Sequence, residues 1–505
     1  MNHKILSLVE LSEHLSSLKS EDKKIVLCHG TFDLLHAGHV KHLQQARQMG
    51  DVLVVTLTAD AFVNKGPNRP VFSESIRSET MSALQVVDFV ALNFTETSEN
   101  IIKILKPDIY VKGEEYAQES EDITGNITLE RSLVEKYGGQ IAFTSGITFS
   151  SSNLLNEFFD VFPPPTRNYL AQLRKKISTA EVLAGIDELR TMKVVVLGEA
   201  IIDEYQYTQP MGQIGKGTAL GVKYQESEKF AGGAIAVANH LSGFVSEVAL
   251  LSVLGNENTQ EAFIRNKLQP NVQPVFGYIE DGCTIQKTRF VADGEKLFEV
   301  YYYNSQPDLT AAEMVLCEWI ETYLETYDLL IVTDFGNGSI SPKMIETLEK
   351  QDIFTAVNTQ LNSGNRGYHV ITRYAKADFI SLNEPELRLA AHDRHGELTK
   401  IASTIKNRLK ASFLSVTRGA EGVLNLGQND QDINEIPALA DKVIDRVGAG
   451  DAYLALSAAM LAKGAPFELA SFIGSVTAAL DVQIVCNREP VKPVLLKKTI
   501  TTFLK

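Results

Sequence analysis

The stretch that decides the fold of the first part of the chain is His29–His39, with the sequence HGTFDLLHAGH. It follows an apolar run at residues 25–27, typical of a buried parallel strand, and leads into a segment with helical apolar spacing that stops at Gly50. This pattern predicts a strand, a glycine turn and a helix that begins beside His39. Because a helix N-terminus favours anions, we expect His36 and His39 to donate hydrogen bonds to a nucleotide phosphate. The alternative is a pair of buried histidines that cap the turn.

Further strands and helices alternate after this turn. Alternation of this kind predicts a parallel sheet, whose ligands bind beyond the carboxyl ends of the strands. Arg77 follows the second strand, so we expect it to reach that crevice, the alternative being a solvated helix face. The expected strands are 51–58, 87–92 and 108–111, and the expected helices are 6–18, 75–85 and 99–105.

The motif GTFDLLHAGH resembles the HxGH signature of the cytidylyltransferase-like nucleotidyltransferases, and the likeness extends over about residues 4–156. Closest in pattern is the nucleotidyltransferase half of the bifunctional heptose kinase/nucleotidyltransferases, which also carry a V-K-G element like 111–113. The resemblance implies that a sugar phosphate displaces pyrophosphate from a nucleoside triphosphate, with His36 and His39 as catalytic residues. The nucleotide-binding residues expected here are Gly30, Thr31, Phe32, Lys41, Arg77, Gly113 and the hydroxyl run Ser150, Ser151 and Ser152.

The size and charge of the chain restrict its class. Its 505 residues exceed one ordinary domain, and we expect two. With 48 basic and 63 acidic residues the net charge is −15, which disfavours nucleic acid and suits a small-molecule enzyme. The four cysteines are widely spaced without a metal-binding pattern, and no apolar run reaches membrane-spanning length. These features predict a cytoplasmic enzyme that does not bind a membrane.

The run Pro163-Pro164-Pro165 marks the expected domain boundary, because three prolines in series favour an extended, helix-breaking spacer. We expect a nucleotidyltransferase domain at 1–160, a proline-containing linker with helices at 161–192, and a second α/β domain at 193–505.

The second domain carries four separated signals, at residues 230–233, 381–386, 416–422 and 445–451. In the last, DRVGAGD, a glycine loop opens a long apolar helix, so its N–H groups would converge on developing phosphate charge. Asp451, at the same helix start, is positioned to accept a hydroxyl proton, although a carboxylate there can also serve as a helix N-cap.

Taken in this order, the four elements resemble the ribokinase/PfkB family of sugar kinases over about residues 193–505. The resemblance implies Asp451 as catalytic base and an anion hole at Gly448, Ala449 and Gly450. It implies that Asn383 and Glu386 govern Mg²⁺ and phosphate, Glu386 indirectly, and that Thr417, Gly419 and Gly422 form the ATP-binding turn. It also implies that Asp203, Gly232 and Gly233 bind the sugar. An alternating stretch at 284–303 reads as a hairpin, which in this family belongs to a lid that often makes a dimer contact.

The chain departs from the heptose kinases at four positions, one of which is Val447, where they have a threonine in the glycine loop. Ala236 stands where they usually have an asparagine, and Asn239 is the nearest amide that could bind substrate in its place. Asn337 and Gln360 stand where they carry lysines, which removes two positive charges near the substrate. The domain order is also swapped relative to the usual heptose enzyme.

Together these observations predict an α/β protein of two domains: a Rossmann-like HxGH nucleotidyltransferase, then a ribokinase-like α/β sandwich with a small β lid. The expected function is synthesis of an ADP- or CDP-heptose-like nucleotide sugar. It would use Mg²⁺, ATP in the kinase step and ATP or CTP in the nucleotidyl step, in a homodimer joined through the kinase lid. One alternative is an active nucleotidyltransferase fused to a catalytically dead kinase-like scaffold or sensor. The other is a cytidylyltransferase that uses glycerol 3-phosphate or another small alcohol phosphate.

Overall fold

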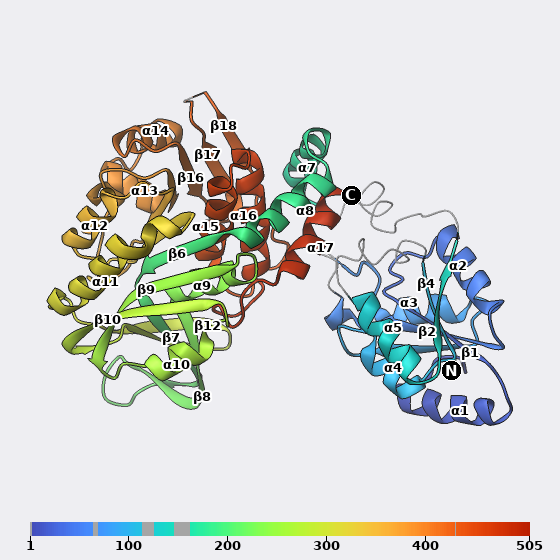
Figure 1. Cartoon of the computed structure of the whole chain (residues 1–505). Coiled ribbons are helices and arrows are strands. Elements are labelled where there is room, and N and C mark those ends of the chain that lie inside the picture. The colour runs from blue at the N-terminus through green and yellow to red at the C-terminus, as the bar shows by residue number, and fades with distance from the viewer. Residues whose placement is uncertain (1–2, 64–68, 114–125, 146–161, 430) are drawn as a thin grey trace. The chain divides into compact units, whose positions relative to one another are not determined.

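The computed structural model describes residues 3–63, 69–113, 126–145, 162–429 and 431–505. The chain divides into two compact units, Met1–Pro164 with Lys497–Lys505, and Pro165–Leu496. Each unit is an α/β structure with its own sheet, as the alternation of strands and helices predicts (Figure 1).

The first unit is built on a five-stranded parallel sheet in the order β3-β2-β1-β4-β5. The order reverses between β1 and β4, and ligands of such sheets bind beyond the strand ends at this switch point. Its elements are α1 (Leu8–Ser20), β1 (Ile25–Gly30), α2 (Ala37–Arg47), β2 (Val52–Thr58), α3 (Glu74–Ser82), β3 (Phe89–Asn93), α4 (Glu99–Leu105), β4 (Ile109–Gly113), α5 (Asn126–Lys136) and β5 (Gln140–Thr144).

The second unit contains a nine-stranded sheet and a separate four-stranded sheet. The large sheet has the order β10-β9-β6-β13-β14-β15-β16-β17-β18; only the β16–β17 and β17–β18 pairs are antiparallel. Its strands are β6 (Lys193–Gly198), β9 (Glu247–Glu257), β10 (Val272–Cys283), β13 (Leu329–Asp334), β14 (Thr355–Thr359), β15 (Phe379–Asn383), β16 (Phe413–Thr417), β17 (Val423–Leu426) and β18 (Ile433–Ile436).

The four-stranded sheet, called the lid below, has the order β12-β11-β7-β8. Its strands are β7 (Ala200–Gln213), β8 (Leu220–Gly233), β11 (Gln286–Ala292) and β12 (Glu295–Tyr302). The antiparallel pair β11–β12 confirms the hairpin expected in this stretch.

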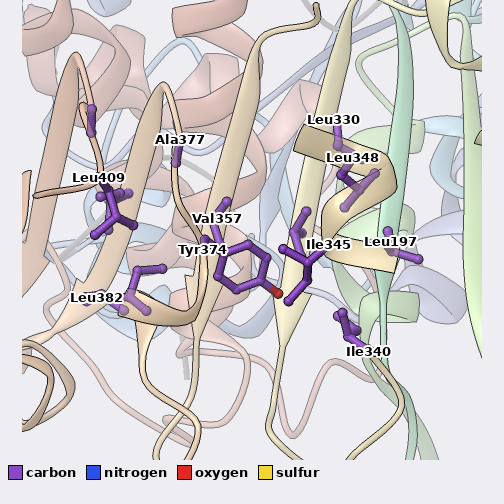
Figure 2. Packing of buried hydrophobic residues seen from close by; sticks show 14 of the residues in the cluster. Leu197, Leu330, Ile340, Ile345, Leu348, Val357, Tyr374, Ala377, Leu382 and Leu409 are labelled. Atoms are coloured by element: carbon purple, nitrogen blue, oxygen red, sulfur yellow. The ribbon is translucent and has the colours of Figure 1, made fainter. Parts of the chain in front are cut away.

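Helices cover both faces of the large sheet. On one face, apolar residues of α11, α12, α13 and α14 pack with alternate strand residues in one buried cluster, part of which Figure 2 shows. Helix α15 contacts the same strands as well as α9 and α16. From α7 onward the helices of the chain are α7 (Pro164–Lys176), α8 (Thr179–Glu188), α9 (Ala234–Ser242), α10 (Glu261–Lys267), α11 (Thr310–Tyr323), α12 (Pro342–Glu349), α13 (Glu384–Ala391), α14 (Leu398–Arg408), α15 (Ala449–Ala462), α16 (Phe467–Asp481) and α17 (Pro493–Leu504), which continues past the end of the second unit at Leu496.

The proline run does not form the extended spacer that we expected. Pro164 and Pro165 are the first two residues of α7. A proline fits the first turn of a helix because its missing N–H would have no partner there and its φ is already helical. The run therefore starts a helix rather than preventing one.

Among the described residues, every helix falls short of the length and apolar character that a membrane crossing requires.

Candidate active sites

The turn between β1 and α2 places both candidate histidines at a helix start. Helix α2 begins at Ala37, earlier than expected, so His36 is the N-cap and His39 lies in the first turn. The Nδ1 atom of His36 accepts a hydrogen bond of 3.1 Å from the N–H of Gly38. His36 thus takes the capping position that the alternative interpretation assigned to it, and it lies at the N-terminal end of the helix, where anions are favoured.

The two histidine rings are stacked, with centroids 3.9 Å apart and planes 22° from parallel. Phe32 packs edge-on against His39 at 5.1 Å between centroids. Burial lowers the pKa of His36, which favours the neutral imidazole. Because its Nδ1 accepts, the proton of the neutral ring is on Nε2, which makes that atom a donor.

The loop between His29 and His36 is held by buried polar groups. Thr31 and Asp33 are both buried, and Phe32 adopts a left-handed conformation with φ of 48°. Asp33 accepts hydrogen bonds from the N–H groups of Val71 (2.9 Å) and Phe72 (3.0 Å). A Cβ at Gly30 would lie 3.1 Å from the Phe32 ring, so glycine allows the strand to end close beneath it.

Arg77 differs from its expected role. It is 2% exposed and donates to the carbonyls of Thr31 (2.6 Å), Thr58 (2.8 Å) and Phe72 (2.9 Å), and to Asp60 at 2.5 Å. These bonds tie the loop after β1 to the end of β2. The guanidinium is therefore a positioning group beneath the turn and does not point freely into the crevice.

The remaining candidates of the first unit are spread along the edge of the sheet. Lys41 lies exposed on α2. Gly113 ends β4, beside β1, and the preceding Lys112 forms an ion pair of 2.9 Å with the buried Glu130. The candidates Ser150, Ser151 and Ser152 lie outside the described residues.

In the second unit, the glycine loop opens α15. Gly448 is the N-cap with φ of 104°, and Ala449 and Gly450 begin the helix. A Cβ at Gly448 would also collide with the side chain of Asn487. Both the positive φ and this close contact therefore favour glycine at position 448. The loop leaves the first N–H groups of α15 without side-chain capping bonds.

Asp451 lies in the first turn of α15. Burial raises the pKa of its carboxyl to about 7, with His240 acting in the opposite direction and Asp481 and Asp203 adding to the rise. His240 and Asp481 form a fully buried pair, with Nε2 and Oδ1 3.4 Å apart. A carboxyl that titrates near neutral pH suits a general base, because it can both hold and release a proton there.

The lid supplies the charged residues that face this helix start. Asp203 on β7 is buried and forms an ion pair with Arg289 of β11, whose Nε is 2.9 Å from Glu299 of β12. The Asp203 carboxylate lies against Gly232, where any Cβ would collide with it. Gly233 has φ of 61° and starts α9. The structure therefore brings Asp203, Gly232 and Gly233 together, and Asp203 is one of the charges that raise the pKa of Asp451.

Asn239 is bound to the backbone. Its amide donates to the carbonyl of Lys267 at 3.0 Å and accepts from the N–H of Gln269 at 3.2 Å. These bonds join α9 to the end of α10, so the Asn239 side chain positions that connection. Asn239 and Ala236 border a cavity of about 180 Å³.

The residues expected at the ATP site gather at the carboxyl ends of β15 and β16. Asn383 caps α13 and is paired across the sheet with Thr417. Glu386 accepts from the N–H groups of Asn383 (2.8 Å) and Leu361 (3.1 Å), and burial raises its pKa to about 7. The turn after β16 uses two left-handed glycines, Gly419 with φ of 58° and Gly422 with φ of 85°.

Within the described residues, no cluster of three or more His, Cys, Asp or Glu side chains is arranged to hold a metal ion. Both oxygens of Glu386 already accept backbone N–H groups, which fits an indirect role toward Mg²⁺. Mg²⁺ usually binds through few protein carboxylates together with substrate phosphates, and this donor set is compatible with that mode.

The sequence did not single out several residues around Asp451 and Asp203. Glu199, just after β6, is fully buried and accepts from the N–H (2.9 Å) and the amide (2.8 Å) of Asn337. Tyr205 and Lys296 of the lid bond Asp445 of the glycine loop at 2.6 and 2.8 Å. Lys287 and Arg289 lie on one face of β11, and Lys287 is paired with Asp203 of β7. Their alternation in the hairpin was a signal for a shared face, although it did not show that the other face would be buried too, as it is at Thr288.

Comparison with known proteins agrees with both units. The cytidylyltransferase-like family model matches residues 27–182, and the pfkB family carbohydrate kinase model matches residues 191–490. The bifunctional protein HldE of Trichlorobacter lovleyi is 41% identical over 140 residues, 27% of each chain. That of Campylobacter concisus is 42% identical over 147 residues, 29% of this chain and 30% of its own. These matches fall in the N-terminal region, so the chain spans less than a third of the relatives' length.

Solved structures match the kinase fold. A putative ribokinase from Agrobacterium tumefaciens has a TM-score of 0.50 at 15% identity and covers 62% of this chain and 99% of its own. Phosphofructokinase-2 from Escherichia coli in complex with potassium also has a TM-score of 0.50, at 17% identity, and covers 62% of this chain and all of its own. With the family model matching more than half of its length, the chain belongs to the pfkB family of carbohydrate kinases and carries a cytidylyltransferase-like domain ahead of the kinase.

Proposed function

We propose that the chain makes a nucleotide-activated sugar, ADP- or CDP-heptose-like, through two phosphorus-transfer reactions. In the kinase reaction a sugar hydroxyl attacks the γ-phosphorus of ATP, its proton passes to Asp451, and ADP leaves with the electron pair of the broken P–O bond. In the nucleotidyl reaction an oxygen of a sugar 1-phosphate attacks the α-phosphorus of ATP or CTP, and pyrophosphate leaves.

The observation that carries the kinase half is the environment of Asp451. Its carboxyl lies at the start of α15 and has a pKa of about 7. Gly448, Ala449 and Gly450 present uncapped N–H groups beside it, which would stabilise the charge that develops on the transferred phosphoryl group. Asp203 would hold the sugar from the lid, between Gly232 and Arg289.

The nucleotidyl half rests on His36 and His39 at the start of α2. A neutral His36 with its proton on Nε2 is a hydrogen-bond donor, and His39 is held against it by stacking. Gly30, Thr31 and Phe32 form the loop that a nucleotide would approach, with Gly113 at the adjacent strand end and Lys41 and Ser150 to Ser152 as further candidates. Mg²⁺ would neutralise phosphate charge in both reactions, with Asn383 and Glu386 acting on it indirectly in the kinase.

We further propose a homodimer through the lid. Strands β8 and β12 are its edges, and both expose large apolar side chains that a partner would cover. The exposed residues are Leu220 (49%) and Tyr224 (59%) on β8 and Phe298 (49%) and Tyr302 (50%) on β12.

A second candidate is an active nucleotidyltransferase fused to a catalytically inactive kinase-like unit. It is favoured by Asn337, which stands where a lysine was expected and whose amide is held by Glu199. The experiment that separates the two supplies the full chain with ATP, CTP and Mg²⁺. ADP formation is measured with a sugar panel, and pyrophosphate release is measured with sugar 1-phosphates and glycerol 3-phosphate. The main proposal expects both products, whereas the second candidate expects pyrophosphate alone. Mass spectrometry of the products identifies the base and the sugar.

A further inference from the structure

Asp445 anchors the segment that leads into the glycine loop. It is 8% exposed, whereas the residues at 441–444 and 446 are exposed. Its Oδ1 atom accepts a hydrogen bond of 3.2 Å from the N–H of Val447, and its own N–H donates to the carbonyl of Val482 at 3.1 Å. A carboxylate that accepts from the N–H two residues further on holds the backbone in a turn. Asp445 therefore fixes the backbone just before the N-cap Gly448.

Two lid residues bind the same carboxylate. The hydroxyl of Tyr205 on β7 donates to Oδ2 of Asp445 at 2.6 Å, and the ammonium of Lys296 on β12 donates to Oδ1 at 2.8 Å. Burial opposes ionisation of Asp445, but the bonds from Lys296, Tyr205 and Val447 together outweigh it and lower its pKa. Asp445 is therefore ionised at neutral pH, and its charge is balanced by a lysine that belongs to the lid.

The glycine loop also packs on the lid. Val447 lies against a buried cluster that includes Tyr205 and Phe230. The Tyr205 ring is edge-on to that of Phe230, with centroids 5.2 Å apart, and Tyr205 is only 3% exposed. The side chain of Lys296, by contrast, is 35% exposed. Packing therefore holds Tyr205 in place, whereas the Lys296 ammonium can be removed without opening the core.

The groups that this anchor positions are the N–H groups of Gly448, Ala449 and Gly450. They have no side-chain cap, so their directions depend on the backbone that precedes them. Glycine restricts that backbone least of all residues, which means that the support must come from outside the loop. A displacement of about 1 Å at reacting groups can cost about 10² in rate. The contact between Lys296 and Asp445 therefore bears on phosphoryl transfer.

We propose that Lys296 is a positioning residue of the kinase reaction. Through its ion pair with Asp445, the lid holds the glycine loop in the shape that stabilises the charge developing on the phosphoryl group. Tyr205 supports the same carboxylate from the neighbouring part of the lid. The inference rests on the proposed kinase function and deepens it, because it assigns the lid a part in phosphoryl transfer through a residue 149 positions away from Asp445 in the sequence.

The test measures ADP formation by the full chain with the sugar of the panel that gives the highest kcat/KM. Lys296→Met keeps the length of the side chain and removes its charge. We expect kcat to fall by at least about tenfold while the KM values for ATP and the sugar change less than about threefold, because the interaction serves the transition state. Lys296→Arg should recover most of the loss, since a guanidinium can also pair with the carboxylate. Circular dichroism checks that each variant is folded.

Tyr205→Phe is a second, independent variant. It removes the hydroxyl bond to Asp445 and keeps the ring that packs on Phe230. Its kcat should fall in the same direction by a smaller factor, about threefold to tenfold, because the bond from Lys296 remains.

Chemical rescue separates the charge of Lys296 from its packing. Lys296→Ala lacks the part of the side chain that n-propylammonium replaces, and the partly exposed position admits it. Added n-propylammonium chloride should raise kcat of Lys296→Ala by at least about threefold, since it restores a charge-assisted bond. Propanol, which has a similar size and no charge, should not, and the wild-type chain should respond to neither.

The matched control is Lys229→Met, which removes a lid lysine bonded to Gln260 at 3.2 Å and should keep kcat and both KM values. An unchanged kcat in Lys296→Met, or a loss confined to the KM for the sugar, would overturn the role of Lys296 and leave the kinase function standing. A fall in kcat that neither Lys296→Arg nor n-propylammonium restores would also overturn it. No ADP from the wild-type chain with any sugar of the panel would overturn the kinase function, and the inference with it.

Discussion

The two helix starts, at α2 and at α15, use the same backbone feature for different chemistry. At α2 the cap is the side chain of His36, and aromatic rings pack around it. At α15 the cap is Gly448, which has no side chain, and a carboxyl follows in the first turn. A helix N-terminus attracts phosphate in either case, so the side chains placed on it decide the reaction. The first offers proton-bearing donors and the second offers a base.

The strongest test of this difference is Asp451→Asn. The amide keeps the size of the carboxyl but cannot accept a proton, so we expect kinase turnover to fall by about 10³ or more while ATP still binds. Sugar-dependent ADP formation and ATP titration measure the two properties. The control is Asp352→Asn, which makes the same substitution at an exposed position. Substantial ADP formation by Asp451→Asn would mean that another group takes the proton.

At the other helix start, His39→Ala should lower nucleotidyl transfer by about 10² or more, the scale expected for loss of a transition-state donor. The fold should be nearly unchanged, as measured by circular dichroism, and kinase turnover should be normal. His14→Ala changes an exposed histidine of α1 and serves as control. Near-normal pyrophosphate release from a folded His39→Ala protein would show that His39 has no catalytic role.

The pH profiles should differ in the same way. The Asp451 carboxyl, with a pKa of about 7, must be ionised to act as a base, so kinase kcat/KM should rise with pH and level off above about 7. Below that value it should fall about tenfold per pH unit. Stopped assays between pH 5 and 9 with a saturating second substrate give the profile. A flat profile through pH 7 would contradict the assignment of the base.

The smallest change in activity is expected for Arg77→Met. Three carbonyls and Asp60 would lose their donor, which should destabilise the first unit by roughly 2–4 kcal/mol. Nucleotidyl transfer should fall less than tenfold at low temperature, because Arg77 supports the turn from beneath. Thermal unfolding with both activity assays measures this, and Arg47→Met, at a 37% exposed side chain, is the control. A large loss of activity with unchanged stability would mean that Arg77 contacts the nucleotide, as the sequence predicted.

Much of this architecture could be predicted from the sequence because it depends on local patterns. Apolar strands, glycine turns and helical spacing predicted the β1–α2 turn, the β11–β12 hairpin and the start of α15. The proline run was misjudged, since the same residues that break a helix also begin one.

Side-chain partners that come from distant segments could not be predicted. Arg77 looked like a crevice residue, but its four acceptors come from three separate segments of the chain. Asn239 looked like a substrate residue, but the backbone after α10 uses its amide. Glu199 was one of 63 acidic residues, and only the fold brings it to Asn337.

The separation of the lid from the large sheet also affects how the kinase can evolve. The proposed base and anion-binding loop lie at the start of α15, whereas Asp203 lies on β7 and Lys287 and Arg289 lie at alternate positions of the neighbouring lid strand β11. We expect substitutions at these positions to change which acceptor the kinase prefers, as long as the bonds of Tyr205 and Lys296 to the glycine loop are kept. Selection for a new acceptor can therefore work on a few alternate positions of β7 and β11, and a library confined to them samples specificity while keeping the chemistry constant.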